Sequence, residues 1–114
     1  MSIYKTITTE TTTTILDASD FGLSSPIHTR SSTNTTTVSK LAIANASSSD
    51  ATVSVFLDHL TSNADKDHYY ITGTVTIPAN VSLVLDDTFS VNLKTHKLVL
   101  TNTGTNPKIT VRID

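Results

Sequence analysis

The residues best suited to chemistry are a few carboxylates and histidines in the second half of the chain. Three of them, Asp65, Asp67 and His68, lie in one polar loop, and alternating carboxylates in a loop are a common source of calcium ligands. Here no Glu completes the coordination, and Lys66 separates the two acids. We therefore interpret residues 61–67 as a solvated hairpin loop, and we predict no metal and no cofactor.

The other titratable residues form no recognisable catalytic set. Asp86 and Asp87 are adjacent, so on a strand their side chains would point to opposite faces, and we assign them to a turn instead. No Ser lies in a Gly-x-Ser-x-Gly elbow, and the loop at Gly104 lacks the second Gly of a phosphate-binding loop. We predict no catalytic residues and no enzymatic activity, although four further candidates are scattered along the chain: His28, Asp58, His59 and His96.

Aromatic side chains are few, and two of them are neighbours. Strand parity places Tyr69 inside with Ile71 and leaves Tyr70 outside. An exposed Tyr serves either as an interface anchor or as part of a sugar-binding platform. We expect Tyr70 to be an interface anchor.

Charge and cysteine content exclude several classes of protein. The formal net charge is −2 with a pI near 6.0, and the eight Lys and Arg form no basic stripe, so we expect no nucleic-acid partner. The chain has no Cys, which removes disulfides and thiol chemistry. Because no apolar run approaches the length of about 20 residues that spans a bilayer, we expect no membrane association. The N-terminus has no signal-peptide pattern, so we also expect an unprocessed, soluble protein.

From Leu41 onward, apolar residues recur at every second position, which is the period of a strand. Turn-rich clusters separate seven such segments, at residues 41–45, 51–58, 69–77, 81–85, 89–93, 97–101 and 109–113. This pattern predicts an all-β fold, an antiparallel β-sandwich of jelly-roll or immunoglobulin-like topology. We expect its interior to contain Leu41, Ile43, Val53, Val55, Leu57, Ile71, Val75, Leu83, Leu85, Leu98, Leu100, Ile109 and Val111.

The first 38 residues differ from the rest. The chain contains 23 Thr and 14 Ser, and 12 of these Thr fall within the first 40 residues, where apolar positions are sparse. We divide the chain into residues 1–38, an extended arm or peripheral strands, and residues 39–114, the sandwich domain. Residues 16–22 also suggest one helical turn. We expect the arm to become ordered on assembly, and we name Tyr4, Ile7, Ile15 and Tyr70 as interface residues.

The order of several segments carries a resemblance, namely residues 41–45 (LAIAN), 51–58 (ATVSVFLD), 68–71 (HYYI), 77–79 (IPA) and 82–87 (SLVLDD). In this respect the chain resembles small virion structural proteins of tailed phages, notably those of marine and cyanobacterial myoviruses. A short stretch such as residues 3–7 precedes the sandwich in that group as it does here. The high Thr content before residue 40 departs from the group and leaves the role of the arm open.

The resemblance implies a non-enzymatic bacteriophage subunit, made in the host cytoplasm and located in the virion. We expect a capsid decoration protein that binds the major capsid protein in many copies, as a homo-oligomer. A tail, neck or baseplate component is the alternative, with other virion proteins as partners. A small carbohydrate-binding module is a second alternative, which glycan binding by the isolated domain would favour.

Overall fold

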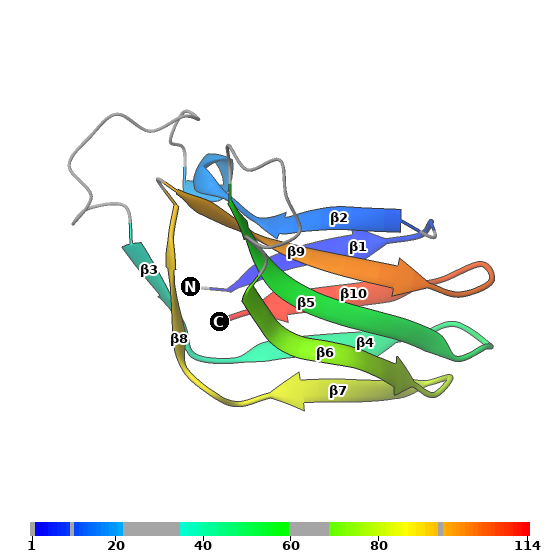
Figure 1. Ribbon diagram of the computed structural model, residues 1–114. Coiled ribbons are helices and arrows are strands. Elements are labelled where there is room, and N and C mark those ends of the chain that lie inside the picture. Colours follow the sequence, from blue (N-terminus) through cyan, green and yellow to red (C-terminus); the bar gives the residue numbers. More distant parts are fainter. Residues whose placement is uncertain (1, 10, 22–34, 60–68, 94) are drawn as a thin grey trace.

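The computed structural model describes residues 2–9, 11–21, 35–59, 69–93 and 95–114. Strands dominate these ranges, and two sheets of four strands face each other (Figure 1). Sheet A has the order β1 (Ile3–Ile7), β10 (Ile109–Ile113), β4 (Leu41–Asn45) and β7 (Val81–Leu85). Sheet B has the order β2 (Thr11–Leu16), β9 (His96–Thr103), β5 (Ala51–His59) and β6 (Tyr69–Ile77).

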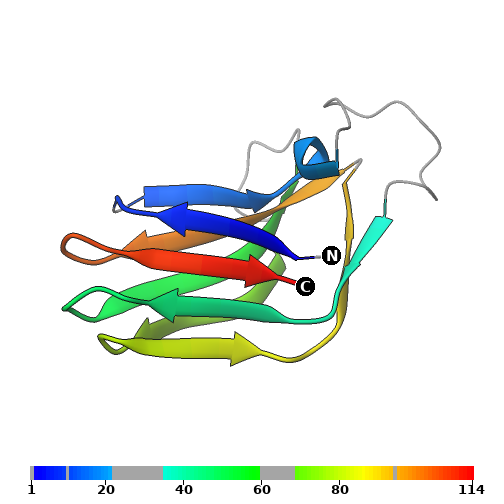
Figure 2. The ribbon, with the colours of Figure 1, turned by 180° about the vertical axis from the view of Figure 1, so that it is seen from behind.

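A third, two-stranded sheet pairs β3 (Thr35–Val38) with β8 (Phe89–Asn92). It crosses the end of the sandwich at which both chain termini lie (Figure 2). A 3-10 helix, η1 (Ala18–Phe21), follows β2 and agrees with the helical turn expected over residues 16–22.

The strand pairs identify the topology. Antiparallel pairs join β1 to β10, β2 to β9, β3 to β8, β4 to β7 and β5 to β6, so the chain is one long hairpin whose tip lies between β5 and β6. Rolling this hairpin into two sheets also pairs β10 with β4 and β5 with β9. This double-sheet arrangement is a jelly roll. The predicted antiparallel sandwich is therefore confirmed, and its topology is the jelly roll and not the immunoglobulin-like alternative.

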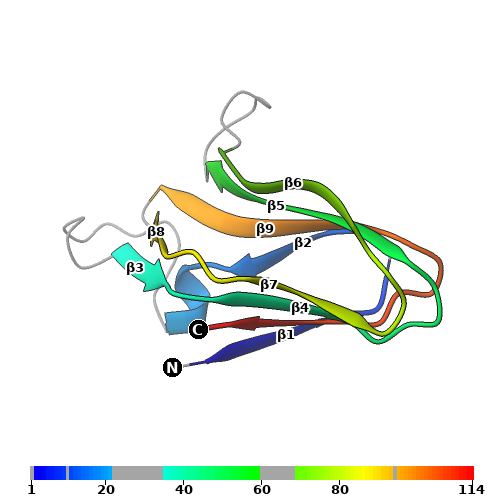
Figure 3. The ribbon, with the colours of Figure 1, turned by 90° about the horizontal axis from the view of Figure 1, so that it is seen from below.

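The core lies between the two sheets, whose layers are seen edge-on in Figure 3. In β4 and β10, alternate residues are buried and the rest are partly exposed, as the period of two requires. Eight of the predicted interior residues are fully buried: Leu41, Ile43, Val53, Val55, Leu98, Leu100, Ile109 and Val111. The other five are only partly buried: Leu57, Ile71, Val75, Leu83 and Leu85.

The N-terminal strands correct one expectation. Ile7 and Ile15 are 3% and 0% exposed, and Leu16 beside them is 1% exposed, all within the core of this single chain. Their burial needs no second subunit, because β1 and β2 are edge strands of sheets A and B. Ile7 and Ile15 are therefore core residues, and naming them as interface residues was wrong.

The burial expected for Tyr69 was also wrong, since this side chain is 58% exposed. Between Val53 and Phe56, the pairing of β5 with β6 shifts twice, and each shift places an extra residue in β6. The two extra residues together restore the alternation, so Tyr69 lies opposite Leu57 on the face that parity predicts. It is exposed because it begins β6, the edge strand of sheet B. Its neighbour Tyr70 is 59% exposed, as expected.

A buried polar side chain, Asn45, forms hydrogen bonds to the turns at the end of the sandwich opposite the chain termini. Asn45 is 1% exposed, and its amide nitrogen donates to the carbonyl oxygens of Ser49 at 3.0 Å and Ile77 at 2.9 Å. Its amide oxygen accepts the N–H of Ser47 at 3.1 Å and the hydroxyl of the same residue. Asn45 therefore joins the β4–β5 turn to the end of β6 through a fully used amide.

Candidate assembly surface

Large apolar side chains are exposed in two places on the described surface. Tyr4, Val81 and Val84 belong to the two outer strands of sheet A, with exposed fractions of 63%, 45% and 51%. Tyr69 and Tyr70 lie at the start of β6, on the edge of sheet B. Exposed apolar groups of this size are candidates for protein contacts.

The outer face of sheet A presents two rows of side chains that cross all four strands. One row across the four strands runs from Tyr4 through Arg112 and Ala42 to Val84. The next row contains only small side chains, which are Thr6, Thr110, Ala44 and Ser82. This face, which we call the A face, therefore has exposed apolar side chains at its two edges, with Arg112 and small residues between them.

The two exposed tyrosines of β6 lie on opposite faces of sheet B. The Tyr70 ring packs against Phe56, with ring centroids 5.2 Å apart, on the outer face. The Tyr69 ring instead lies 5.7 Å from the His96 ring, which is itself 5.0 Å from His59. Since these rings point in opposite directions, they cannot form one continuous platform.

The two long sides of the sandwich are closed differently. On the side of β1 and β2, the Lys5 ammonium lies 2.6 Å from the carboxylate of Asp20 in η1, so an ion pair covers the core. The second carboxylate oxygen of Asp20 accepts the N–H of Asp17. On the side of β6 and β7, the core residues Ile71, Leu83 and Leu85 are only partly buried. The apolar interior therefore reaches solvent along the β6–β7 side.

Of the four predicted interface residues, Tyr4 and Tyr70 are exposed, on the A face and on the outer face of sheet B respectively. Their role in assembly stays a prediction. The sequence reasoning missed Val81 and Val84. The strand VSLVL has a valine on each face, but only the place of β7 at the end of sheet A leaves these valines exposed.

Of the residues considered for catalysis or metal binding, the structure brings together His59 and His96, whose ring centroids are 5.0 Å apart. His28, Asp65, Asp67 and His68 fall outside the described residues, whereas Asp86 and Asp87 are exposed beyond the end of β7. Within the described ranges, no three His, Cys, Asp or Glu side chains are grouped as metal ligands. The same part of the chain contains no helix with the length and apolar character needed to cross a membrane.

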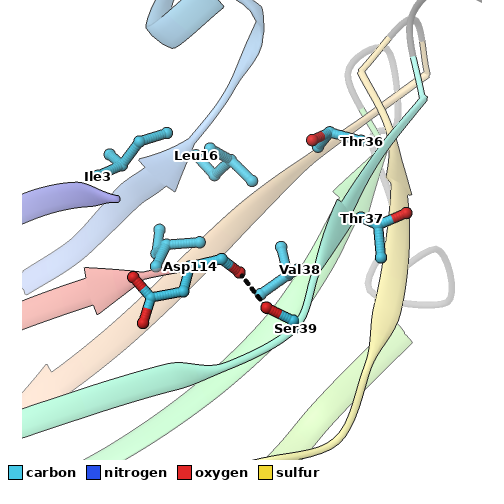
Figure 4. Close-up of a pocket in the computed structure, with 8 residues that line it drawn as sticks. Ile3, Leu16, Thr36, Thr37, Val38, Ser39 and Asp114 are labelled. Atoms are coloured by element: carbon cyan, nitrogen blue, oxygen red, sulfur yellow. Dashed lines mark hydrogen bonds between the residues drawn. The ribbon is translucent and has the colours of Figure 1, made fainter. Parts of the chain in front are cut away.

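One cavity, with a volume of about 350 Å³, lies between β3 and the ends of β1, β2 and β10 (Figure 4). Its lining is mixed: Ile3, Leu16, Thr36, Thr37, Val38, Ser39, Ile113 and Asp114. The Ser39 hydroxyl donates to the Asp114 carbonyl oxygen at 3.2 Å. Asp114 supplies the single carboxyl side chain of the lining, and a hydrogen bond from the Ser2 hydroxyl holds its pKa below the usual 3.8. This lining offers no pair of titratable groups for acid–base chemistry.

Comparison with known proteins identifies the fold. No protein-family profile matches the sequence, and no curated protein matches it. A chain of the acid-stable capsid of Helicobacter pylori bacteriophage KHP30 superimposes with a TM-score of 0.56 at 10% identity, covering 99% of this chain and 83% of that one. The Drosophila NLP core gives 0.55 at 12% identity, with 99% and 92% covered. A chain of the virus-like particle of Macrobrachium rosenbergii extra small virus gives 0.47 at 12% identity, with 99% and 72% covered. At these identities the first two similarities establish a shared jelly-roll fold.

Proposed function

We propose that this protein is a non-enzymatic structural subunit of a virion. The observation that carries the proposal is the match of the whole jelly roll, over 99% of the chain, to a chain of a phage capsid. The A face, with the small Ala44 near its centre and the exposed Tyr4 and Val84 at its edges, suits a subunit that docks on another protein.

Within this class, we favour a decoration protein of a tailed phage of the marine or cyanobacterial myovirus type. Such a subunit binds the major capsid protein in many copies and sits on the outside of the lattice. The A face would make this contact, with Tyr4 as the aromatic anchor at its edge. A tail, neck or baseplate component is the alternative, in which a small number of copies form a ring.

Attachment to the particle tests the role of the A face. Particles lacking the protein are mixed with purified chain, and the bound fraction is measured by co-sedimentation. The Ala44→Arg variant places a large charged side chain at the partly exposed centre of the A face, and we expect it to lose attachment. Thr74→Arg is the matched control, because it adds the same charge to an exposed position on β6 of sheet B. Equal attachment of both variants would refute the A face as the docking surface.

The Drosophila NLP core offers a different model for this fold, since it is described as forming a pentamer and binding histones. Histones are strongly basic, and a partner for them needs a strongly acidic surface. This chain has ten acidic and eight basic residues. Its weak charge favours a virion subunit over a histone-binding role.

Glycan binding is the rival from another class. A sugar platform needs coplanar exposed rings, whereas Tyr69 and Tyr70 contact ring partners on opposite sides of β6. We expect the isolated protein to bind no glycan on a glycan array. Specific binding that is lost in Tyr70→Ala would favour a carbohydrate-binding module instead.

A further inference from the structure

Strand β7 is an open sheet edge without the usual protection. It lies at the end of sheet A, and β4 is its neighbour on the other side. Its sequence VSLVL contains no charge and no Pro, and its pairing with β4 is regular over all five residues. Natural proteins shield edge strands with charges, Pro or bulges, because an unshielded edge pairs with another strand.

The other three edges of the two main sheets carry such protection. In β1, Lys5 occupies an inward-facing position opposite Val111 and is held by Asp20. In β2, a register shift lies between Thr14 and Leu16. In β6, the two shifts opposite β5 distort the edge. Protection that is present on three edges and missing from the fourth marks β7 as a pairing site.

We propose that β7 pairs antiparallel with β7 of a second copy of this chain, around a two-fold axis at Leu83. In this register Leu83 faces Leu83 of the second copy, and Val81 faces Leu85. Ser82 then faces Val84. A two-fold axis normal to the sheet keeps the inner faces on one side, so the two copies of sheet A join into one sheet of eight strands.

Burial favours this pairing. Val81 is 45% exposed and Val84 is 51% exposed, while Leu83 and Leu85 are partly buried at the open β6–β7 side. Each of these four residues gains an apolar or small neighbour across the axis. The pairing therefore covers the apolar interior where the sandwich leaves it open, and it satisfies the edge groups of β7.

The exposed acids after β7 favour antiparallel over parallel pairing of the two β7 strands. Asp86 and Asp87 follow β7 and are exposed. Antiparallel pairing places the acids of the two copies at opposite ends of the β7–β7 strand pair, where Asp86 of one copy faces Asn80 of the other. Asp50, the nearby carboxylate at that turn, already accepts the Ala79 N–H at 3.2 Å. A parallel arrangement would instead bring both pairs of acids together.

The test uses two double variants of the purified full-length chain. Ser82 and Val84 are both exposed on the outer side of β7, so charges there leave the monomer core intact. Ser82→Lys with Val84→Lys puts like charges directly opposite each other across the axis. Ser82→Glu with Val84→Lys puts opposite charges at the same places. Circular dichroism confirms that both variants fold.

Sedimentation velocity reads out the result. We expect the wild-type chain and the Glu–Lys variant to sediment with twice the 12.2 kDa chain mass. We expect the Lys–Lys variant to be a monomer, with self-association at least about tenfold weaker. A monomeric wild type, a larger ring, or equal association of the two variants would overturn the proposal. This result is independent of the virion role, because a dimer without particle attachment would refute the proposed function alone.

Discussion

Replacing Ile15 with Ala tests whether β2 belongs to the core or to an arm. Ile15 is 0% exposed and lies in the core cluster with Ile7 and Leu16. Cutting a fully buried Ile to Ala typically costs about 2–5 kcal/mol, because apolar contact is lost and a cavity remains. Against a total stability of about 5–15 kcal/mol, this is a large fraction.

The assay is thermal unfolding of the purified full-length chain, followed by circular dichroism at one fixed protein concentration. For a chain of this size, each kcal/mol lowers Tm by roughly 3–6 °C, so we expect a fall of about 6–30 °C. Thr12→Ala is the matched control, because Thr12 lies on the same strand and is exposed. Its expected change is within about 0.5 kcal/mol.

Comparison of Ile15→Ala with the Thr12→Ala control shows which result would contradict the core assignment. If β2 were an arm that orders only on a particle, Ile15→Ala would unfold at the same temperature as Thr12→Ala. Equal melting temperatures would therefore refute the core assignment of Ile15 and with it the jelly-roll role of β2. Truncation of both N-terminal strands is expected to unfold the chain for the same reason.

Three further outcomes are expected. Asn45→Ala leaves the carbonyls of the turns without their donor and should cost about 2–4 kcal/mol, measured by urea unfolding; a loss below about 1 kcal/mol would contradict the role of Asn45. Val55→Asp buries an unpaired charge at a 0% exposed site and should abolish folding, so a folded variant by circular dichroism would disprove its burial. Because the folded pKa of Asp114 is lowered, its bond to Ser2 stabilises the fold above pH 3.8 and is lost as pH falls below that value. Ser2→Ala should therefore be less stable than wild type at neutral pH and equal to it in acid, and a difference that persists in acid would refute this coupling.

Regular alternation made the second half of the chain predictable. The seven strands expected after residue 40 all occur, and eight expected interior residues are fully buried. In β4 and β10, for example, neighbouring strands pair without a shift, so inside and outside follow directly from residue number. Where the ladder is regular, hydrophobic period determines the face of each side chain.

Bulges and edge strands explain why the burial of side chains in β2 and β6 could not be predicted from the sequence. The shift between Thr14 and Leu16 allows the adjacent Ile15 and Leu16 both to be buried, which breaks the alternation expected of a strand. The run of four Thr in β2 hides the contribution of this strand to the core, because only its last two residues are apolar. Tyr69 lies on the predicted face, opposite Leu57, but is exposed because it begins the edge strand β6.

The candidate surface was predictable only in part. Tyr4 and Tyr70 stand out as aromatic residues at outward positions, and both are exposed. Val84 became visible only once β7 was placed at the end of sheet A, because exposure of an edge valine depends on strand order. Strand order arises from contacts between segments far apart in the chain, and local pattern does not encode it.

Copy number per particle tests the central claim most directly. Quantitative mass spectrometry of purified virions, calibrated with labelled peptides of this chain and of the major capsid protein, gives the ratio of the two proteins. A decoration protein predicts a ratio near one or a simple fraction of one, corresponding to copies on the order of hundreds. About six or twelve copies would indicate a tail, neck or baseplate ring instead. Absence of the chain from purified virions would contradict a structural role in the particle.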